Sequence, residues 1–279
     1  MDNMAPQTVM LILLLTCSAC VGGSPDGAPI ANRPQTSVLI VSGISRDPAD
    51  QAARLQAVGG LRDHMLKHMS VEPRRLTILT ADKPGAPPAS SLQSTASQIA
   101  QTIDTLAATV HPEDKFIFYY LGQANAAGGE LRFNLPGPDM TQKELADRLK
   151  TIKANAQLIV LDCPCAGMAA KTLSGPNRVV VCASAATQPL GTRFSSHFVQ
   201  ALSQPQTDTD SDGKVSLLDV FAATAREIEQ WYRQQSLLPT ETPCLEDDGD
   251  GTPSERPWKY QTENGDGLKA STFWLVEGH

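Results

Sequence analysis

Short apolar runs alternate along the chain with stretches whose apolar residues recur at helical spacing. The apolar runs, typical of buried parallel strands, lie at 38–42, 76–80, 115–121, 157–162 and 178–183. The helical spacing predicts helices at 48–69, 92–110, 141–154, 195–202 and 217–234. One more short strand is expected at 130–135. Strands that alternate with helices predict an α/β fold, in which helices cover both faces of a parallel sheet.

Polar residues at the predicted starts of two helices support these assignments. Asp47 precedes Pro48, and an aspartate can cap a helix whose first turn contains a proline. Thr141 and Glu144 have the spacing of a capping box, in which each side chain bonds the other residue's backbone N–H. We therefore expect helices to begin at both places.

The first 36 residues have the pattern of an export signal followed by a tether. The apolar run at 9–15 is shorter than the about 20 residues that a membrane-spanning helix needs, but it suits the core of a signal peptide. Cys20 follows the small residue Ala19, and this pattern resembles a bacterial lipoprotein signal, in which the cysteine is acylated. We expect a signal peptide at 1–20, a flexible tether rich in Gly and Pro at 21–36, and export to the periplasm or cell envelope with a lipid anchor on Cys20.

Composition and charge limit the partners that the chain can have. Of its 279 residues, 41% are hydrophobic and 19% are charged, which is typical of a globular protein. There are 30 Asp and Glu residues against 23 Lys and Arg residues, and the formal net charge is -7. Because an acidic chain repels a phosphate backbone, we expect no nucleic acid partner.

The candidate chemistry follows two of the predicted strands, because sites in parallel α/β sheets lie at the carboxyl ends of strands. The first segment reads Gly122-Gln123-Ala124, and the second reads Asp162-Cys163-Pro164-Cys165-Ala166-Gly167. These segments resemble the two catalytic segments of the caspase-like peptidases, the clan of caspases, metacaspases and legumains, and look like a bacterial, legumain-like branch. The resemblance implies a caspase-like three-layer sandwich over 37–236, with a mostly parallel central sheet flanked by helices.

Both catalytic positions of the clan are substituted in this chain. The clan uses a histidine as base and a cysteine as nucleophile. Here Gln123 stands at the histidine position and Pro164 at the cysteine position. Glutamine takes up no proton at neutral pH, and proline has no nucleophilic atom. The resemblance therefore implies a pseudo-peptidase, which recognises a peptide or protein ligand or serves as a scaffold without cleaving it.

Two other functions stay open at this point. Cys163 and Cys165 flank Pro164, and either could be the nucleophile of an active cysteine peptidase whose base lies elsewhere in the chain. The chain could instead be a calcium-stabilised structural component of a surface assembly. Of the histidines, His64 and His68 share one helix face, which we interpret as exposed surface rather than a metal site.

Residues 208–219 have the pattern of a twelve-residue EF-hand calcium loop. Gly213 occupies the position of the sharp turn, and a helix is expected to follow from Leu217. The segment before the loop is broken at Gln204 and Pro205, so only half of an EF-hand is present. The predicted Ca²⁺ ligands are the side chains or carbonyl oxygens of Asp208, Asp210, Asp212, Lys214, Ser216 and Asp219.

The remaining predictions concern the cysteines and the C-terminal extension. In an exported chain, a disulfide can join Cys163 or Cys165 to Cys182 or Cys244; the alternative is four reduced, buried thiols. The C-terminal extension, residues 237–279, is rich in Asp, Gly and Pro. We expect a last strand within it, at 272–276. The acidic cluster at 246–251 could bind a second ion, complete the first site, or be a solvated loop.

Overall fold

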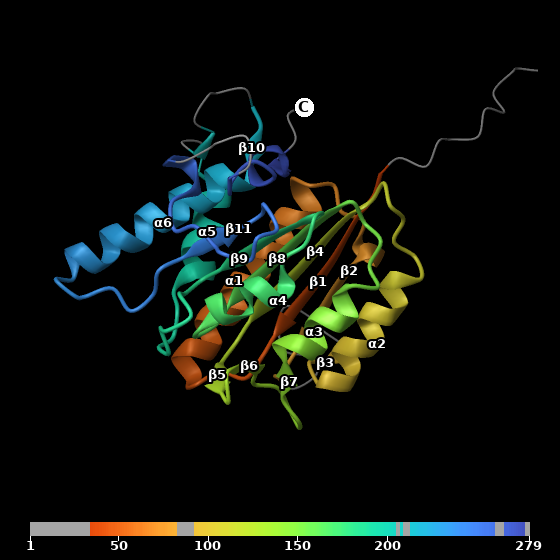
Figure 1. Cartoon of the computed structure of the whole chain (residues 1–279), viewed down its shortest axis with the longest axis horizontal. Helices are drawn as coiled ribbons and strands as arrows, with labels where there is room; N and C mark the ends of the chain where they lie inside the picture. The colour runs from red at the N-terminus through yellow and green to blue at the C-terminus, as the bar shows by residue number, and fades with distance from the viewer. Residues whose placement is uncertain (1–33, 83–91, 205–206, 209–212, 260–264, 277–279) are drawn as a thin grey trace, which may run out of the picture. The chain divides into compact units, whose positions relative to one another are not determined.

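Seven strands form the central sheet of the computed structural model, in the order β11-β9-β8-β4-β1-β2-β3 (Figure 1). Their neighbours run parallel except β11, which pairs antiparallel with β9. The strands are β1 Thr36–Ser42, β2 Leu76–Thr80, β3 Leu92–Gln93, β4 Lys115–Leu121, β8 Ala156–Asp162, β9 Arg178–Cys182 and β11 Cys244–Glu246. The structure describes residues 34–82, 92–204, 207–208, 213–259 and 265–276. The signal peptide, Cys20 and most of the tether lie outside these residues.

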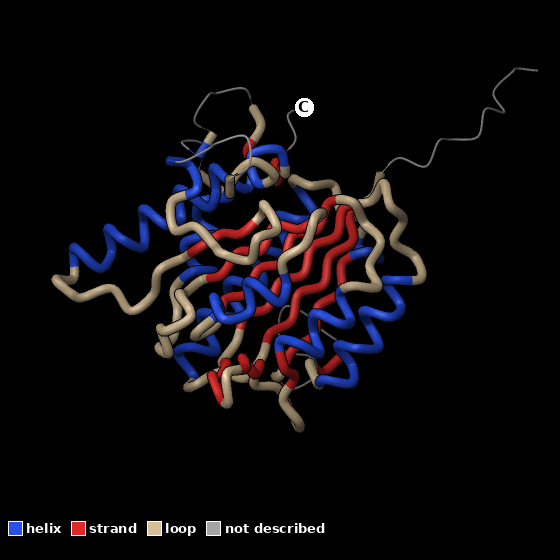
Figure 2. Tube along the Cα trace, viewed as in Figure 1, coloured by secondary structure: helices blue, strands red, loops and turns tan. Residues whose placement is uncertain are grey.

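Helices cover both faces of this sheet, as Figures 1 and 2 show. One face packs against α1 Pro48–Lys67, α5 Phe194–Leu202 and α6 Leu217–Gln234. The other packs against α2 Ala96–Ala107, α3 Gln142–Leu149 and α4 Ala170–Leu173. The predicted α/β fold with a mostly parallel sheet between helices is confirmed.

The alternation of side chains along each central strand explains why the strands read as unbroken apolar runs. In β4, Ile117, Tyr119 and Leu121 face the core under α1 and α5. The residues between them, Phe116, Phe118 and Tyr120, face the core under α2 and α3. Because both faces of a parallel sheet are buried, every position along the strand is apolar.

Smaller elements lie at the ends of the main sheet. Beyond β4, a three-stranded antiparallel sheet contains β5 Ala124–Ala127, β6 Glu130–Phe133 and β7 Met140–Thr141. The strand β10 Val215–Ser216 pairs antiparallel with β12 Trp274–Val276. Short 3₁₀ helices are η1 Pro73–Arg75, η2 Ala166–Ala169, η4 Pro257–Lys259 and η5 Ala270–Thr272. Among the described residues, no helix has the length and apolarity that crossing a membrane requires.

The capping predictions are confirmed. The Asp47 side chain accepts the Asp50 N–H at 2.8 Å, and α1 begins at Pro48. Thr141 and Glu144 form the capping box at the start of α3.

Two predicted helices have a bound that is wrong by four or more residues, and the strand β11 was not predicted. The helix expected from 92 begins at 96, because the Thr95 hydroxyl caps it by accepting the Gln98 N–H at 3.2 Å. Leu92 and Gln93 instead form β3, beside β2. The helix expected to end at 154 ends at 149, because the Gln157 side-chain amide donates to the carbonyls of Ile152 and Ala154 at 3.0 and 2.9 Å. Within the C-terminal segment, the sequence analysis missed β11, which extends the main sheet.

Candidate functional site

A small polar cavity of about 40 Å³ lies where β4 and β8 end, bordered by α1 and α5. Leu121 and Asp162 are partners in the register of the two strands, and the Gly122 N–H donates to the Asp162 carbonyl at 3.0 Å. The two segments singled out from the sequence therefore lie side by side. The polar side chains that line the cavity include those of Gln123, Asp162, Thr192, Arg54 and Arg193.

Gln123 is held at this edge of the sheet by its backbone. Its N–H donates to the Ile44 carbonyl at 3.1 Å, and its carbonyl accepts the Tyr120 hydroxyl at 2.7 Å. The Tyr120 ring explains the glycine before Gln123: a Cβ at Gly122 would lie 2.4 Å from the Tyr120 hydroxyl oxygen. The half-buried Gln123 side chain lines the cavity at the position where the resemblance places a histidine.

Asp162 joins the end of β8 to the start of α5. One carboxylate oxygen accepts the Ser195 N–H at 3.0 Å, and the other accepts the Thr192 hydroxyl. A carboxylate at the first turn of a helix is stabilised by the unpaired N–H groups and the helix dipole. Asp162 is 8% exposed, so its carboxylate serves mainly to connect the two elements.

The two thiols that flank Pro164 are buried away from the cavity. Cys163 is 0% exposed and Cys165 is 4% exposed, and both pack in the core that lies under α2 and α3. Burial raises the pKa of both thiols, and the Asp162 carboxylate raises the pKa of Cys163 further. A nucleophilic cysteine needs the opposite, a lowered pKa, because the thiolate is the reactive form. Pro164 is buried between them.

The turn that contains Pro164 is fixed against the loop after β9. The Cys165 N–H donates to the Gln188 carbonyl, and the Gly167 N–H donates to the Ser184 carbonyl, both at 2.9 Å. A Cβ at Gly167 would lie 2.8 Å from the Ala186 nitrogen, so only glycine fits there. The match of Gly167 to the clan's motif therefore has a packing reason in this chain.

No histidine of the described residues lines this cavity. The prediction that His64 lies on an exposed face is wrong: it is 5% exposed and its Nε2 bonds the Leu275 carbonyl at 2.9 Å. The contact could not be seen in the sequence, because it joins α1 to β12. His68 stacks on His64 at 5.0 Å, and His197 lies 3.4 Å from Glu227.

A larger groove of about 400 Å³ shares Asp50, Thr192 and Arg193 with the small cavity. Asp50 pairs with Arg54 at 2.7 Å and lies 3.8 Å from Arg46. The Arg46 guanidinium lies against Gly191, where a Cβ would be 2.7 Å away. Arg46 is 52% exposed, so its charge is available to a ligand in the groove.

Arg193 lines both the cavity and the groove, and Glu241 contacts it; neither residue was identified from the sequence. The Arg193 N–H donates to Glu241 at 2.7 Å, and its guanidinium stacks over Trp231, 3.7 Å from the ring centroid. Glu241 is 1% exposed and accepts the Tyr232 hydroxyl at 3.2 Å. Burial, assisted by the Asp162 charge, raises the pKa of Glu241 to about 7. The sequence signal for Glu241 was weak, since a single acid in a loop is ordinarily exposed.

The predicted calcium loop is described only in part, because Asp210 and Asp212 lie outside the described residues. Gly213 has a φ of +80°, and its N–H donates to the Asp208 carboxylate at 3.0 Å. The second Asp208 oxygen is buried and accepts no hydrogen bond from the residues that the structure describes. Ser216 and Asp219 form a capping box at the start of α6, which begins at Leu217 as predicted. The Lys214 ammonium lies 5.4 Å from the Trp274 ring centroid.

Cys163, Cys165, Cys182 and Cys244 are buried, and none of them forms a disulfide in the structure. Cys182 and Cys244 are direct partners in the pairing of β9 with β11. The sequence analysis considered other pairs, each containing Cys163 or Cys165. Disulfide formation stays a prediction, and the sheet register favours Cys182 with Cys244.

No family model matches the sequence, and no curated protein is similar to it. Among solved structures, the chain is similar to the Drosophila initiator caspase Dronc, with a TM-score of 0.50 and 12% identity. The similarity covers 78% of this chain and 80% of that chain. At this level of identity, a likeness of structure shows the fold alone. The chain therefore has a caspase-like fold, as the resemblance of its strand ends implies.

Proposed function

We propose that this chain is an exported, lipid-anchored, calcium-binding protein of caspase-like fold, which recognises a peptide or protein ligand and does not cleave it. The observation that carries the proposal is the chemistry of the two strand ends. Gln123 and Pro164 stand where the resemblance places the catalytic histidine and cysteine, and the neighbouring thiols are buried with raised pKa values. Both components of a Cys–His dyad are therefore missing from the place where this fold would hold them.

Export and anchoring rest on the first 20 residues alone. The apolar run at 9–15 and the small residue before Cys20 support a signal peptide followed by acylation. A lipid on Cys20 would hold the caspase-like domain at a membrane surface, where a recognition or scaffold protein can meet its ligand.

The groove beside the strand ends supports recognition of an acidic ligand. Three arginines line the groove and the adjoining cavity together with the carboxylates of Asp50 and Asp162, and the Glu241 carboxylate lies 3.9 Å from the Arg193 guanidinium. Because the pKa of Glu241 is raised to about 7, the three guanidinium charges face two to three carboxylate charges, a near balance that contrasts with the formal net charge of -7 for the whole chain. A peptide carboxylate would pair with the exposed guanidinium of Arg46, which matches carboxylate geometry.

We expect the purified, reduced protein to cleave no peptide after Asn, Asp, Arg or Lys, with or without calcium. Neither strand end offers a base or an exposed thiolate for the attack on a peptide bond. The measurement is release of a fluorophore from labelled peptides of each type. Turnover that Cys163→Ala or Cys165→Ala abolishes would establish the active-peptidase alternative, provided that the core variant Cys182→Ala retains it.

The groove is tested by peptide binding. A fluorescent oligoglutamate peptide should bind the wild type, and Arg46→Glu should weaken binding by about tenfold or more, equivalent to about 1.4 kcal/mol. Arg62→Glu is the matched control, since Arg62 lies on α1 outside the groove and is similarly exposed. Fluorescence anisotropy measures both affinities. If both variants lost the same affinity for the peptide, binding would depend only on the total charge of the protein. That result would contradict recognition in the groove.

A further inference from the structure

The loop that follows β11 repeats the ligand spacing of the predicted calcium loop. In residues 246–251, carboxylates stand at the first, third and fifth places and a glycine at the sixth, as in residues 208–213. The ninth place is a serine in both loops, Ser254 and Ser216. The last place differs: Asp219 closes the first loop, whereas Pro257 occupies the corresponding place after β11.

The two loops also share a backbone contact. Gly251 has a φ of +79° and donates its N–H to Glu246 at 3.2 Å. In the first loop, Gly213 has a φ of +80° and donates to Asp208 at 3.0 Å. In each loop, the first carboxylate thus accepts the N–H of the glycine at the sixth place, and this hydrogen bond closes the turn.

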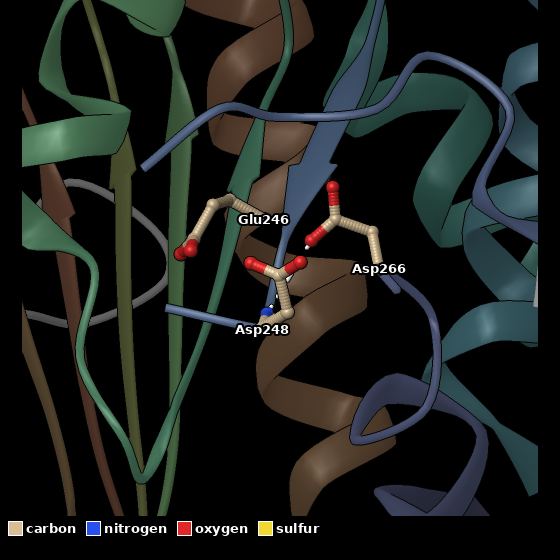
Figure 3. Close-up of side chains that lie close together, drawn as sticks. All are labelled: Glu246, Asp248 and Asp266. Carbon is tan, nitrogen blue, oxygen red and sulfur yellow. Dashed lines mark hydrogen bonds between the residues drawn. The ribbon is translucent and has the colours of Figure 1, made fainter. Parts of the chain in front are cut away.

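Pro257, at the last place of the second loop, has no carboxylate, and Asp266 from a later segment contributes one instead. Glu246, Asp248 and Asp266 each place an oxygen within 4.8 Å of the others, and Figure 3 shows the Asp248 carboxylate between those of Glu246 and Asp266. The Asp266 carboxylate is fixed by the N–H groups of Asp247 and Ser254, at 2.8 and 3.0 Å. Asp247 in turn accepts the N–H groups of Gly267 and Ala270, both at 2.8 Å, which holds the segment with Asp266 against the loop.

Glu246 has a carboxylate oxygen that lacks a partner. Its side chain is 0% exposed, and Oε1 accepts the N–H groups of Gly249 and Gly251. Oε2 is buried and has no hydrogen-bond partner among the described residues. Within the described parts of the chain, no Lys or Arg forms an ion pair with Glu246, Asp248 or Asp266. A buried, unpaired carboxylate oxygen is costly, and a cation removes the cost.

We propose that Glu246, Asp248 and Asp266 bind a second calcium ion, separate from the loop at 208–219. Three carboxylates provide the hard oxygen ligands that calcium prefers, and the exposed side of Asp248 leaves room for water to complete the coordination. The bound ion would tie the edge strand β11 to the segment that leads into β12.

The test is to count calcium bound to the full chain by equilibrium dialysis against calcium chloride. Asp248→Asn should weaken binding of one ion by at least about tenfold, the lower end of the loss when even an outer-shell partner of a metal ligand is removed. Asp147→Asn, which changes an exposed aspartate of α3, should bind as many ions as the wild type. Since Asp248 is exposed and its substitution removes one of the crowded charges, the melting temperature in chelator should not fall.

A third variant, in the loop 208–219, tests whether the two sites bind different ions. Asp212→Ala should lose a different ion, so that the double variant with Asp248→Asn binds neither. If only Asp212→Ala changed the number of bound ions, and Asp248→Asn bound like the wild type, the second site would not exist. If Asp212→Ala changed nothing while Asp248→Asn lost its ion, the second site would stand and the first loop would fail.

Discussion

In a protein that carries Asp248→Asn, calcium should still raise the melting temperature, and adding Asp212→Ala should cancel that rise. The first substitution removes the second site, so that the remaining effect belongs to the loop 208–219. Carboxylates crowded into one loop repel each other, and calcium replaces the repulsion with six to eight oxygen contacts. At about a hundredfold excess over Kd, the folded state should gain about 2.7 kcal/mol. For a chain of this size the gain corresponds to roughly 5–10 °C.

The control for this experiment is Thr209→Ala, a change within the loop that removes no predicted ligand side chain. It should keep the calcium-dependent rise. The measurement is a thermal melt in calcium and in chelator for each protein. Coincident melting curves in calcium and chelator for Asp248→Asn would mean that residues 208–219 are only an acidic turn.

Between about pH 4.5 and pH 7, the free energy of unfolding of the wild type should fall as Glu241 becomes charged. The variant Glu241→Gln should not show this part of the fall. The pKa of Glu241 rises on folding from 4.5 to about 7, chiefly because its carboxyl is buried. A raised folded-state pKa gives stability that is fully present below the unfolded pKa and is lost as pH rises through the folded value. At about 1.4 kcal/mol per pKa unit, the loss amounts to about 3 kcal/mol as an upper figure.

This prediction is measured as the difference between variant and wild type, since other buried acids titrate in both proteins. Urea unfolding at pH 5 and pH 8 gives the free energy of unfolding at each pH. Glu113→Gln, at an exposed position, should follow the wild type. If Glu241→Gln lost as much stability as the wild type over this range, Glu241 would be charged throughout, and its burial beside Arg193 and Asp162 would not perturb it.

The features that could be predicted from the sequence depend on residues close together in the chain. Apolar runs such as 115–121 identify strands buried on both faces, and the bounds of α6 follow from its helical spacing and the serine that caps it. The position of the candidate site follows from a rule of topology, since parallel strands bring their carboxyl ends to one edge. Gln123 and Asp162 lie at that edge for this reason.

What the sequence could not provide are contacts between distant segments. The bond between Arg193 and Glu241 joins residues 48 positions apart, and the contact of His64 with Leu275 spans 211. Periodicity carries no information on such pairings. The strand β11 was missed because its three residues form no apolar run and lie in a segment rich in Pro, Gly and Asp. Its pairing with β9 positions Glu246, one of the three carboxylates of the second candidate site.

The absence of peptidase chemistry is tested most directly by the reactivity of the individual thiols, since that measurement needs no knowledge of a substrate. The native, reduced protein is treated with iodoacetamide at neutral pH, and alkylation of each cysteine is followed over time by mass spectrometry. The fully buried Cys182 is the internal reference, and denatured protein shows that the thiols of Cys163, Cys165 and Cys182 can react. The account predicts that Cys163 and Cys165 react as slowly as Cys182. A rate at Cys163 or Cys165 above that of free cysteine would contradict it.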